Sequence, residues 1–277
     1  MKIRFFLPFL LIFFTIFRVS CQELPTVSER FLKDYQEISF ITQYNFFSSD
    51  RFWNKKGRNI SAYNKVTHQS VSLFAEYGIA STDTVGLYTF YAQNHEEMNR
   101  SPRGIGDLEL VWKHFISSIQ SYDFSFQIIG IIPTGDAITS VRYGEWGIES
   151  DLHCQKNFTL YERFAWFEVL AGYRYYHGSP SDQLRGQIIG GYYLLPSLKL
   201  ICEAAVDYSL SLKDDRFEGP VLIMPMNYRL LQTREQLVWD VSEWVSVYIG
   251  SSQNLYGRNI GAEISFFGGI WFDYALN

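Results

Sequence analysis

The sequence predicts an all-β protein, a transmembrane antiparallel β-barrel of about twelve strands. Aromatic residues make up 18% of the chain, with 19 Tyr and 23 Phe, and this composition suits strands and the aromatic girdles of membrane barrels. Apolar and polar residues alternate along many segments, so successive side chains point to opposite faces of a strand. The connections between these segments alternate between short and long, as the turns and loops of outer-membrane barrels do.

The N-terminus predicts export. Lys2 and Arg4 precede an apolar stretch, Phe5 to Phe17, which has the length of a signal-peptide core and is too short to cross a bilayer as a helix. We therefore expect a signal peptide over residues 1–21.

The same interpretation predicts two parts of the mature chain. We expect an N-terminal periplasmic segment over residues 22–36 and an outer-membrane β-barrel over residues 37–277, in the bacterial outer membrane. Lipidation of Cys21 is the alternative to cleavage after it, but Arg18 stands where a lipoprotein signal has an apolar residue. The partners expected from this location are outer-membrane lipid and the barrel-assembly machinery.

The strand pattern is clearest from Leu198 to Leu210, where the even positions are apolar or aromatic and Lys199, Glu203 and Asp207 fall between them. Such a segment needs an apolar environment on one side and water or charged partners on the other. Similar alternation predicts strands near residues 37–47, 66–78, 84–92, 107–115, 122–132, 147–156, 163–176, 183–194, 198–210, 228–239, 243–250 and 260–274.

The connections provide an independent argument for a barrel. With both termini periplasmic, every long connection faces outward, and a soluble sandwich has no reason to sort its loops in this way. The expected long or medium outer loops are Ser48–Lys65, Gln93–Gly106, Thr134–Trp146, His177–Asp182, Ser211–Asn227 and Ser251–Asn259. The expected short turns are Ala80–Asp83, Ser117–Ser121, Asn157–Thr159, Leu195–Ser197 and Asp240–Ser242.

Composition excludes several other classes of protein. The net charge of -5 offers no basic footprint, so we expect no nucleic-acid partner. Beyond the leader only Cys154 and Cys202 remain, both on outward-facing positions, which excludes a disulfide-stapled scaffold and a Cys-based zinc site. There is no P-loop and no dinucleotide fingerprint, and we expect no cofactor.

Four short motifs carry a resemblance to a known family. They are YNFFSSDRFWNKKG at Tyr44 to Gly57, EYGI at Glu76 to Ile79, GIGD at Gly104 to Asp107 and PTGD at Pro133 to Asp136. In order and spacing they resemble the outer-membrane proteins named for the meta-pathway of phenol degradation. The turn-motif residues are Gly104, Gly106, Asp107, Pro133, Thr134, Gly135 and Asp136, with the glycines expected to supply positive φ.

The resemblance implies a barrel that passes small solutes, often hydrophobic or aromatic compounds, and it implies no catalytic residues. The chain differs from a common barrel signature, because its last residue is Asn277 rather than the aromatic that the assembly machinery recognises. Trp271, Phe272 and Tyr274 lie close by.

Charged residues on the inward parity are the expected pore lining. Facing acidic and basic walls would orient polar solutes by a transverse field. The alternative is that these charges pair with one another and plug the lumen. The candidates are Glu149, Asp151, His153, Glu168, Arg174, Arg185, Lys199, Glu203, Asp207 and Glu263.

Other functions are weaker readings of the same sequence. A barrel-borne hydrolase would need a base beside a nucleophile, and His68 and Ser70 share one face of a strand. Glu149, Asp151 and His153 also share a face, but no second strand offers a further metal ligand, so no metal site is expected. A structural or adhesin-like role would use the outer loops, and the apolar run at 221–226 is unusual for a solvated loop.

Overall fold

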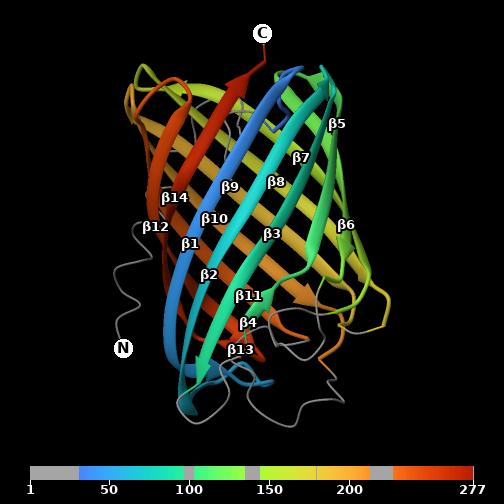
Figure 1. Ribbon diagram of the computed structural model, residues 1–277, viewed down its shortest axis with the longest axis vertical. Coiled ribbons are helices and arrows are strands. Elements are labelled where there is room, and N and C mark those ends of the chain that lie inside the picture. The colour runs from blue at the N-terminus through green and yellow to red at the C-terminus, as the bar shows by residue number, and fades with distance from the viewer. Residues whose placement is uncertain (1–30, 97–102, 135–143, 179, 213–226, 277) are drawn as a thin grey trace.

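The computed structural model describes residues 31–96, 103–134, 144–178, 180–212 and 227–276. It is a closed barrel of tilted antiparallel strands (Figure 1). Within these residues no helix has the length and apolarity that a membrane span requires. The strands are β1 (Glu37–Trp53), β2 (Asn59–Ala80), β3 (Asp83–Glu96), β4 (Arg103–Ile105), β5 (Leu108–Ile119), β6 (Tyr122–Ile132), β7 (Gly147–Leu160), β8 (Arg163–Tyr176), β9 (Gln183–Leu195), β10 (Leu198–Ser209), β11 (Arg229–Asp240), β12 (Val245–Arg258), β13 (Ile260–Gly261) and β14 (Ile264–Ala275).

The barrel closes because β1 pairs with both β2 and β14. Phe40 lies opposite Ala75 on one side and opposite Phe272 on the other. The short β4 and β13 only extend the edges of β3 and β1, which leaves twelve strands in the wall. The predicted fold class is therefore confirmed.

The two ends of the barrel differ. One end holds the tight turns, and we call it the turn end; Glu37 pairs with Ala275 there. Two of its turns have positive φ at both central residues, Gln120–Ser121 and Tyr161–Glu162, which matches the right-handed twist of the flanking strands. The opposite end, which we call the loop end, carries the long connections (Figure 1).

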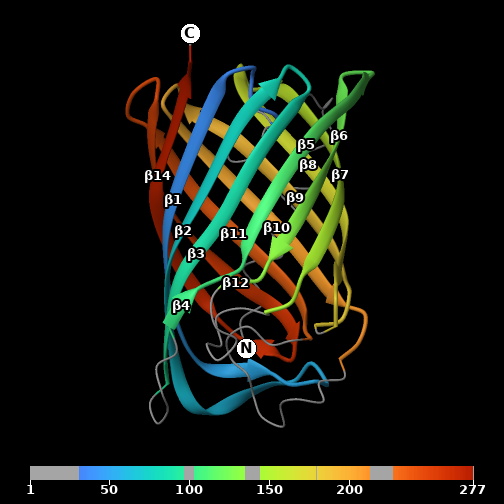
Figure 2. The same cartoon turned by 45° about the vertical axis from the view of Figure 1, so that its right-hand side comes forward.

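The first outer connection differs from the prediction. Most of Ser48–Lys65 is strand, because β1 and β2 continue well beyond the predicted limits and only Asn54–Arg58 connects them. The sequence of this hairpin no longer alternates between apolar and polar residues, but the backbone groups of its two strands pair with each other. Phe52 also pairs with Gly261. A register shift follows Ser49, and the hairpin bends across the loop end (Figure 2).

Other predicted connections also lie inside strands. Ser117 belongs to β5, Asn157–Thr159 to β7 and most of Ser251–Asn259 to β12. In each case polar residues suggested a turn, whereas hydrogen bonding to a neighbouring strand extends the sheet. Residues 1–30 with Cys21, and the apolar run at 221–226, lie outside the described residues.

The two faces of the wall have opposite chemistry. Leu152 and Phe266 on the outer face are 64% and 61% exposed, whereas Glu149 on the inner face is 1% exposed. An outward apolar band and a polar interior are what a barrel in a bilayer requires. Cys154 and Cys202 lie on the outward parity, half-buried, and both are free thiols.

Candidate functional site: the barrel interior

A ladder of charges runs along one part of the inner wall. The Glu149 carboxylate on β7 accepts from Arg174 on β8, and it also accepts from Arg185 on β9 at 2.6 Å. Arg185 continues to Asp207 on β10 at 2.8 Å, and Arg174 reaches Glu109 on β5 at 3.5 Å. Two of these contacts, Glu149 to Arg185 and Arg174 to Glu109, join strands that are not neighbours, as inward-facing groups of a barrel can.

The other predicted lining residues occupy the same face. The His153 ring lies 2.6 Å from the Glu168 carboxylate, with both side chains buried. Asp151 accepts from Gln127 at 2.7 Å, and Lys199 pairs with Asp240 at 3.3 Å.

Two candidates stand apart from these pairs. Glu203 shares the inward parity of β10 and is half-buried. Glu263 lies between β13 and β14 rather than within a closing strand, since the strand predicted from 260 is interrupted there.

The acidic and basic groups do not form two facing walls. They alternate along β5 to β10 and neutralise one another between neighbouring or nearby strands. The expected transverse field is therefore not what this arrangement produces. Because the pairs lie along the wall rather than across the lumen, they leave part of the interior space free.

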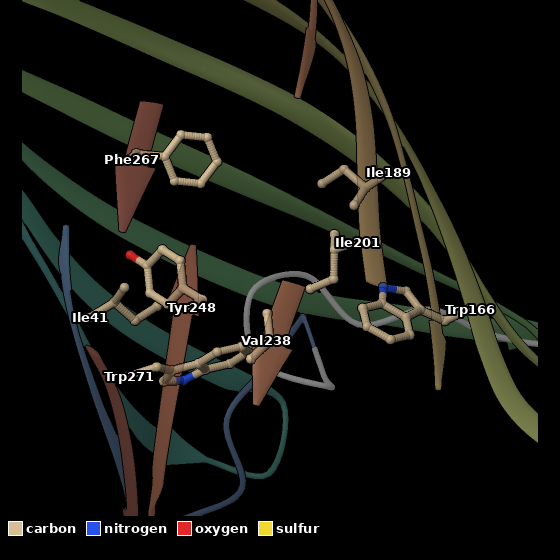
Figure 3. Close-up of a cluster of buried hydrophobic side chains, with 8 residues drawn as sticks. All are labelled: Ile41, Trp166, Ile189, Ile201, Val238, Tyr248, Phe267 and Trp271. Carbon is tan, nitrogen blue, oxygen red and sulfur yellow. The ribbon is translucent and has the colours of Figure 1, made fainter. Parts of the chain in front are cut away.

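An apolar cluster lies in another part of the interior. Its buried members come from β1, β8, β9, β10, β11, β12 and β14 (Figure 3). They are Ile41, Trp166, Ile189, Ile201, Val238, Tyr248, Phe267 and Trp271. Sequence reasoning missed this cluster because its members come from separate strands, one or two at a time, and form no apolar run.

The residues before β1 also lie inside the barrel, and we call residues 31–36 the inner segment. Lys33 is 2% exposed, and its Nζ lies 2.8 Å from the Asp273 carboxylate on β14. Its backbone N–H donates to Thr84 Oγ1 on β3 at 2.8 Å. The Gln36 N–H donates to the Gly78 carbonyl on β2 at 2.8 Å.

Phe31 contacts strands on the side of the barrel away from β14. Its ring centroid lies 4.0 Å from that of His153 on β7, and Lys113 Nζ on β5 donates to the Phe31 carbonyl at 3.2 Å. In the barrel order, five strands separate β7 from β14 on either side, so the two are diametrically opposed. The contacts of the inner segment therefore extend inside the barrel from β14 to the opposite strand β7.

Gly78 makes this crossing sterically feasible. A Cβ at this position would lie 1.9 Å from the Asp34 carbonyl oxygen and 2.9 Å from that of Lys33. Both are backbone atoms and cannot swing away. The glycine of the EYGI motif thus serves the close approach of the inner segment to β2, a role that its sequence did not reveal.

A cavity of about 330 Å³ lies inside the barrel, lined by residues of β1, β2, β3, β5, β6, β11 and β12. Its walls combine apolar side chains such as Phe74 and Ile129 with charged ones such as Lys113 and Arg234. Lys113 also contacts Phe31, so the cavity adjoins the inner segment. A second cavity of about 570 Å³, lined in part by Asp34 and Glu37, lies at the turn end.

The turn motifs act differently from the prediction. Neither Gly104 nor Gly106 has positive φ. Gly104 pairs with Ala92 within a short strand, and a Cβ on Gly106 would lie 2.2 Å from the Phe90 ring. These glycines therefore allow close packing rather than a left-handed turn.

The neighbouring motif residues support this packing. Asp107 is buried, and the Thr134 hydroxyl donates to the Gly106 carbonyl. Pro133 follows the end of β6. Gly135 and Asp136 lie outside the described residues.

Known structures share this architecture. An outer-membrane channel from Pseudomonas putida F1 superposes with a TM-score of 0.68 at 13% sequence identity, covering 87% of this chain and 97% of that one. The NanC porin gives 0.53 at 8% identity, over 84% and 98%. The KdgM porin gives 0.51 at 11% identity, over 85% and 99%. No protein family and no curated protein matches the chain by sequence.

This chain has the fold of outer-membrane channels. At such low sequence identities the likeness is one of fold alone, and it does not identify a solute for this chain. The specific resemblance to the phenol-pathway proteins receives no support from the sequence comparisons.

Within the described residues, the interior of the barrel does not assemble the alternative sites. The His68 ring bonds to Asn94 at 2.6 Å, and the Ser70 hydroxyl accepts from Asn45 at 3.3 Å, so the two do not form a base and nucleophile pair. Glu149 is occupied by two arginines. No group of His, Cys, Asp and Glu in the described part of the chain is arranged to hold a metal ion.

Proposed function

We propose that this protein resides in the bacterial outer membrane and passes small solutes through the interior of the barrel. The observation that carries the proposal is an internal cavity of about 330 Å³ within a wall that is apolar outside and polar inside. A barrel that served only as an anchor would have no need of such a space. The fold shared with an outer-membrane channel and two porins supports the same role.

The proposed orientation puts the turn end in the periplasm. Short periplasmic turns and long outer loops are the rule in such barrels. Residues 1–21 would then be a signal peptide and residues 22–36 a periplasmic segment whose last part, the inner segment, enters the lumen. The charge ladder from Glu109 to Asp207 would line the solute path. The barrel-assembly machinery and outer-membrane lipid are the partners of this proposal.

We further propose that the chain is a distant relative of the phenol-pathway outer-membrane proteins and takes solutes with a hydrophobic or aromatic body. The four motifs support this relationship. The apolar side chains Ile41, Phe74 and Ile129 in the cavity wall support such solutes, because an apolar surface gains from covering an apolar body.

The test begins with the protein refolded in detergent. We expect unboiled protein to migrate faster on a gel than boiled protein, and to conduct ions in a planar bilayer. A shifted band with a silent bilayer would overturn conduction and favour a structural or adhesive role. Solubility without detergent and no gel shift would overturn membrane insertion itself.

A further inference from the structure

Arg234 on β11 faces the cavity without an acidic partner. Its guanidinium donates to the amide oxygen of Gln43 and lies 3.9 Å from the Phe267 ring centroid. In the described part of the chain no carboxylate oxygen lies within 4.0 Å of it. A guanidinium offers five N–H donors, and these contacts leave several of them available.

Four other cations of the described interior already have acidic partners. Arg174 and Arg185 share Glu149, Lys113 pairs with Glu76 at 2.5 Å, and Lys199 pairs with Asp240. Arg234 therefore differs from them in being held beside a cavity with a neutral amide and an aromatic ring. A half-buried cation without a counter-ion favours the binding of an anion.

In the described part of the chain, the acidic groups near Arg234 do not form an ion pair with it. Glu203 lies opposite Arg234 across the β10–β11 pair but does not reach its guanidinium within 4.0 Å. Glu109 is the carboxylate that lines the cavity, and it points to Arg174. Since Lys113 pairs with Glu76 and Glu109 with Arg174, Arg234 is the charged residue of this cavity lining that forms no ion pair within the described part of the chain.

The rest of the cavity wall is suited to an apolar body. Ile41, Val111 and Ile129 are buried side chains of three different strands that line the same space as Arg234. The Tyr248 hydroxyl lies within hydrogen-bond distance of both the Gln43 amide oxygen, at 3.3 Å, and the Thr42 carbonyl, at 3.2 Å. It therefore helps to position the amide oxygen that Arg234 binds. The polar end and the apolar walls therefore belong to one cavity.

We propose that this cavity binds a small amphipathic monocarboxylate, with its carboxylate on Arg234 and its ring or short chain against Ile41, Val111 and Ile129. This inference rests on the proposed channel function and names a solute class for it. Arg and carboxylate form strong, geometrically matched hydrogen bonds. A neutral analogue of the same shape fills the apolar part but leaves the guanidinium without an anion.

The experiment compares two matched probes, 4-methylbenzoate and 4-methylbenzyl alcohol, by calorimetric titration of the protein in nanodiscs of zwitterionic lipid. We expect the unmodified protein to bind the benzoate more tightly than the alcohol. Arg234→Gln should weaken benzoate binding about tenfold or more and change alcohol binding less than about twofold. Arg163→Gln, which removes the same charge at the β7–β8 turn, should change neither.

Equal binding of the two probes, or an unchanged affinity for benzoate in Arg234→Gln, would overturn the inference. If Arg234→Gln does not give the folded gel band, Ile129→Trp takes its place, because it fills the cavity and should abolish binding of both probes. Retained binding in that variant would also overturn the inference. Bilayer conductance is recorded on the same samples, so a protein that conducts without binding benzoate contradicts only the solute class.

Discussion

Removing the Lys33 charge should open the lumen, because Lys33 joins the inner segment to the last strand. Its Nζ lies 2.8 Å from the Asp273 carboxylate, with the lysine side chain 1% exposed and the aspartate 35% exposed. Lys33→Met keeps most of the apolar stem and removes the ammonium group. When its partner is lost, the Asp273 carboxylate can be hydrated instead. We therefore expect the docked inner segment to lose about 2 kcal/mol of stability, which is within the range for a charged hydrogen bond.

The Lys33 ammonium also lies 3.5 Å from the Glu37 carboxylate, so both of its acidic contacts are lost in Lys33→Met. A loss of about 2 kcal/mol shifts the ratio of docked to undocked inner segment about 30-fold.

Planar-bilayer recording measures this shift as a higher mean conductance and a longer dwell in the most open level. Lys65→Met, which removes an exposed lysine of β2, is the matched control. Asp273→Asn should reproduce part of the effect, because Lys33 keeps its contact with Glu37. The double variant should add little to Lys33→Met alone, since that substitution already breaks the contact with Asp273. Unchanged conductance in Lys33→Met, or fully additive effects, would refute the role assigned to the inner segment.

Three further substitutions test the wall of the barrel, each by the temperature at which the unboiled gel band converts to the boiled one. Glu149→Gln should lower this conversion temperature, with a loss of about 3 kcal/mol of barrel stability, because two arginines lose their shared carboxylate. Gly106→Ala should cost about 1–3 kcal/mol by overpacking against Phe90, and Phe90→Leu should restore part of it. Leu152→Arg, on the outer face near the middle of β7, should cost about 2–4 kcal/mol if that face meets hydrocarbon.

The controls separate these causes from general damage. Glu203→Gln removes a carboxylate that holds no arginine and should leave the conversion temperature nearly unchanged. Tyr161→Arg places the same charge at an exposed turn and should be tolerated. A conversion temperature that does not respond to Leu152→Arg would argue against insertion of this face in lipid. Failure of Phe90→Leu to improve Gly106→Ala would show that the cost lies elsewhere.

The strand pattern was predictable because the physics of the outer face is simple. A side chain that meets hydrocarbon must be apolar, so alternate residues carry a signal that needs no knowledge of their neighbours. The predicted limits of 122–132 and 163–176 equal those of β6 and β8. The limits of β1 and β2 were predicted too short, since beyond the apolar band a strand is maintained by backbone pairing and its side chains obey no such rule.

The interior was harder to predict because its contacts join residues far apart in the chain. The charged residues of the ladder were recognised from their parity, but the pairing that makes them one wall depends on which strands are neighbours. The apolar cluster draws single residues such as Ile41 and Trp271 from opposite ends of the sequence. The inner segment was read only as a periplasmic stretch, although the burial of Phe31 and Lys33 gives it a defined place.

The contact between Lys33 and Asp273 has a consequence for the order of assembly. It joins positions 240 residues apart, and it spans the seam at which β1 meets β14. The docking site of the inner segment is therefore complete only when the final strand has been added and the sheet has closed on itself. Contacts of such long separation form late, because chain entropy must first be lost elsewhere. The inner segment is thus held on both sides of the seam only in the finished barrel.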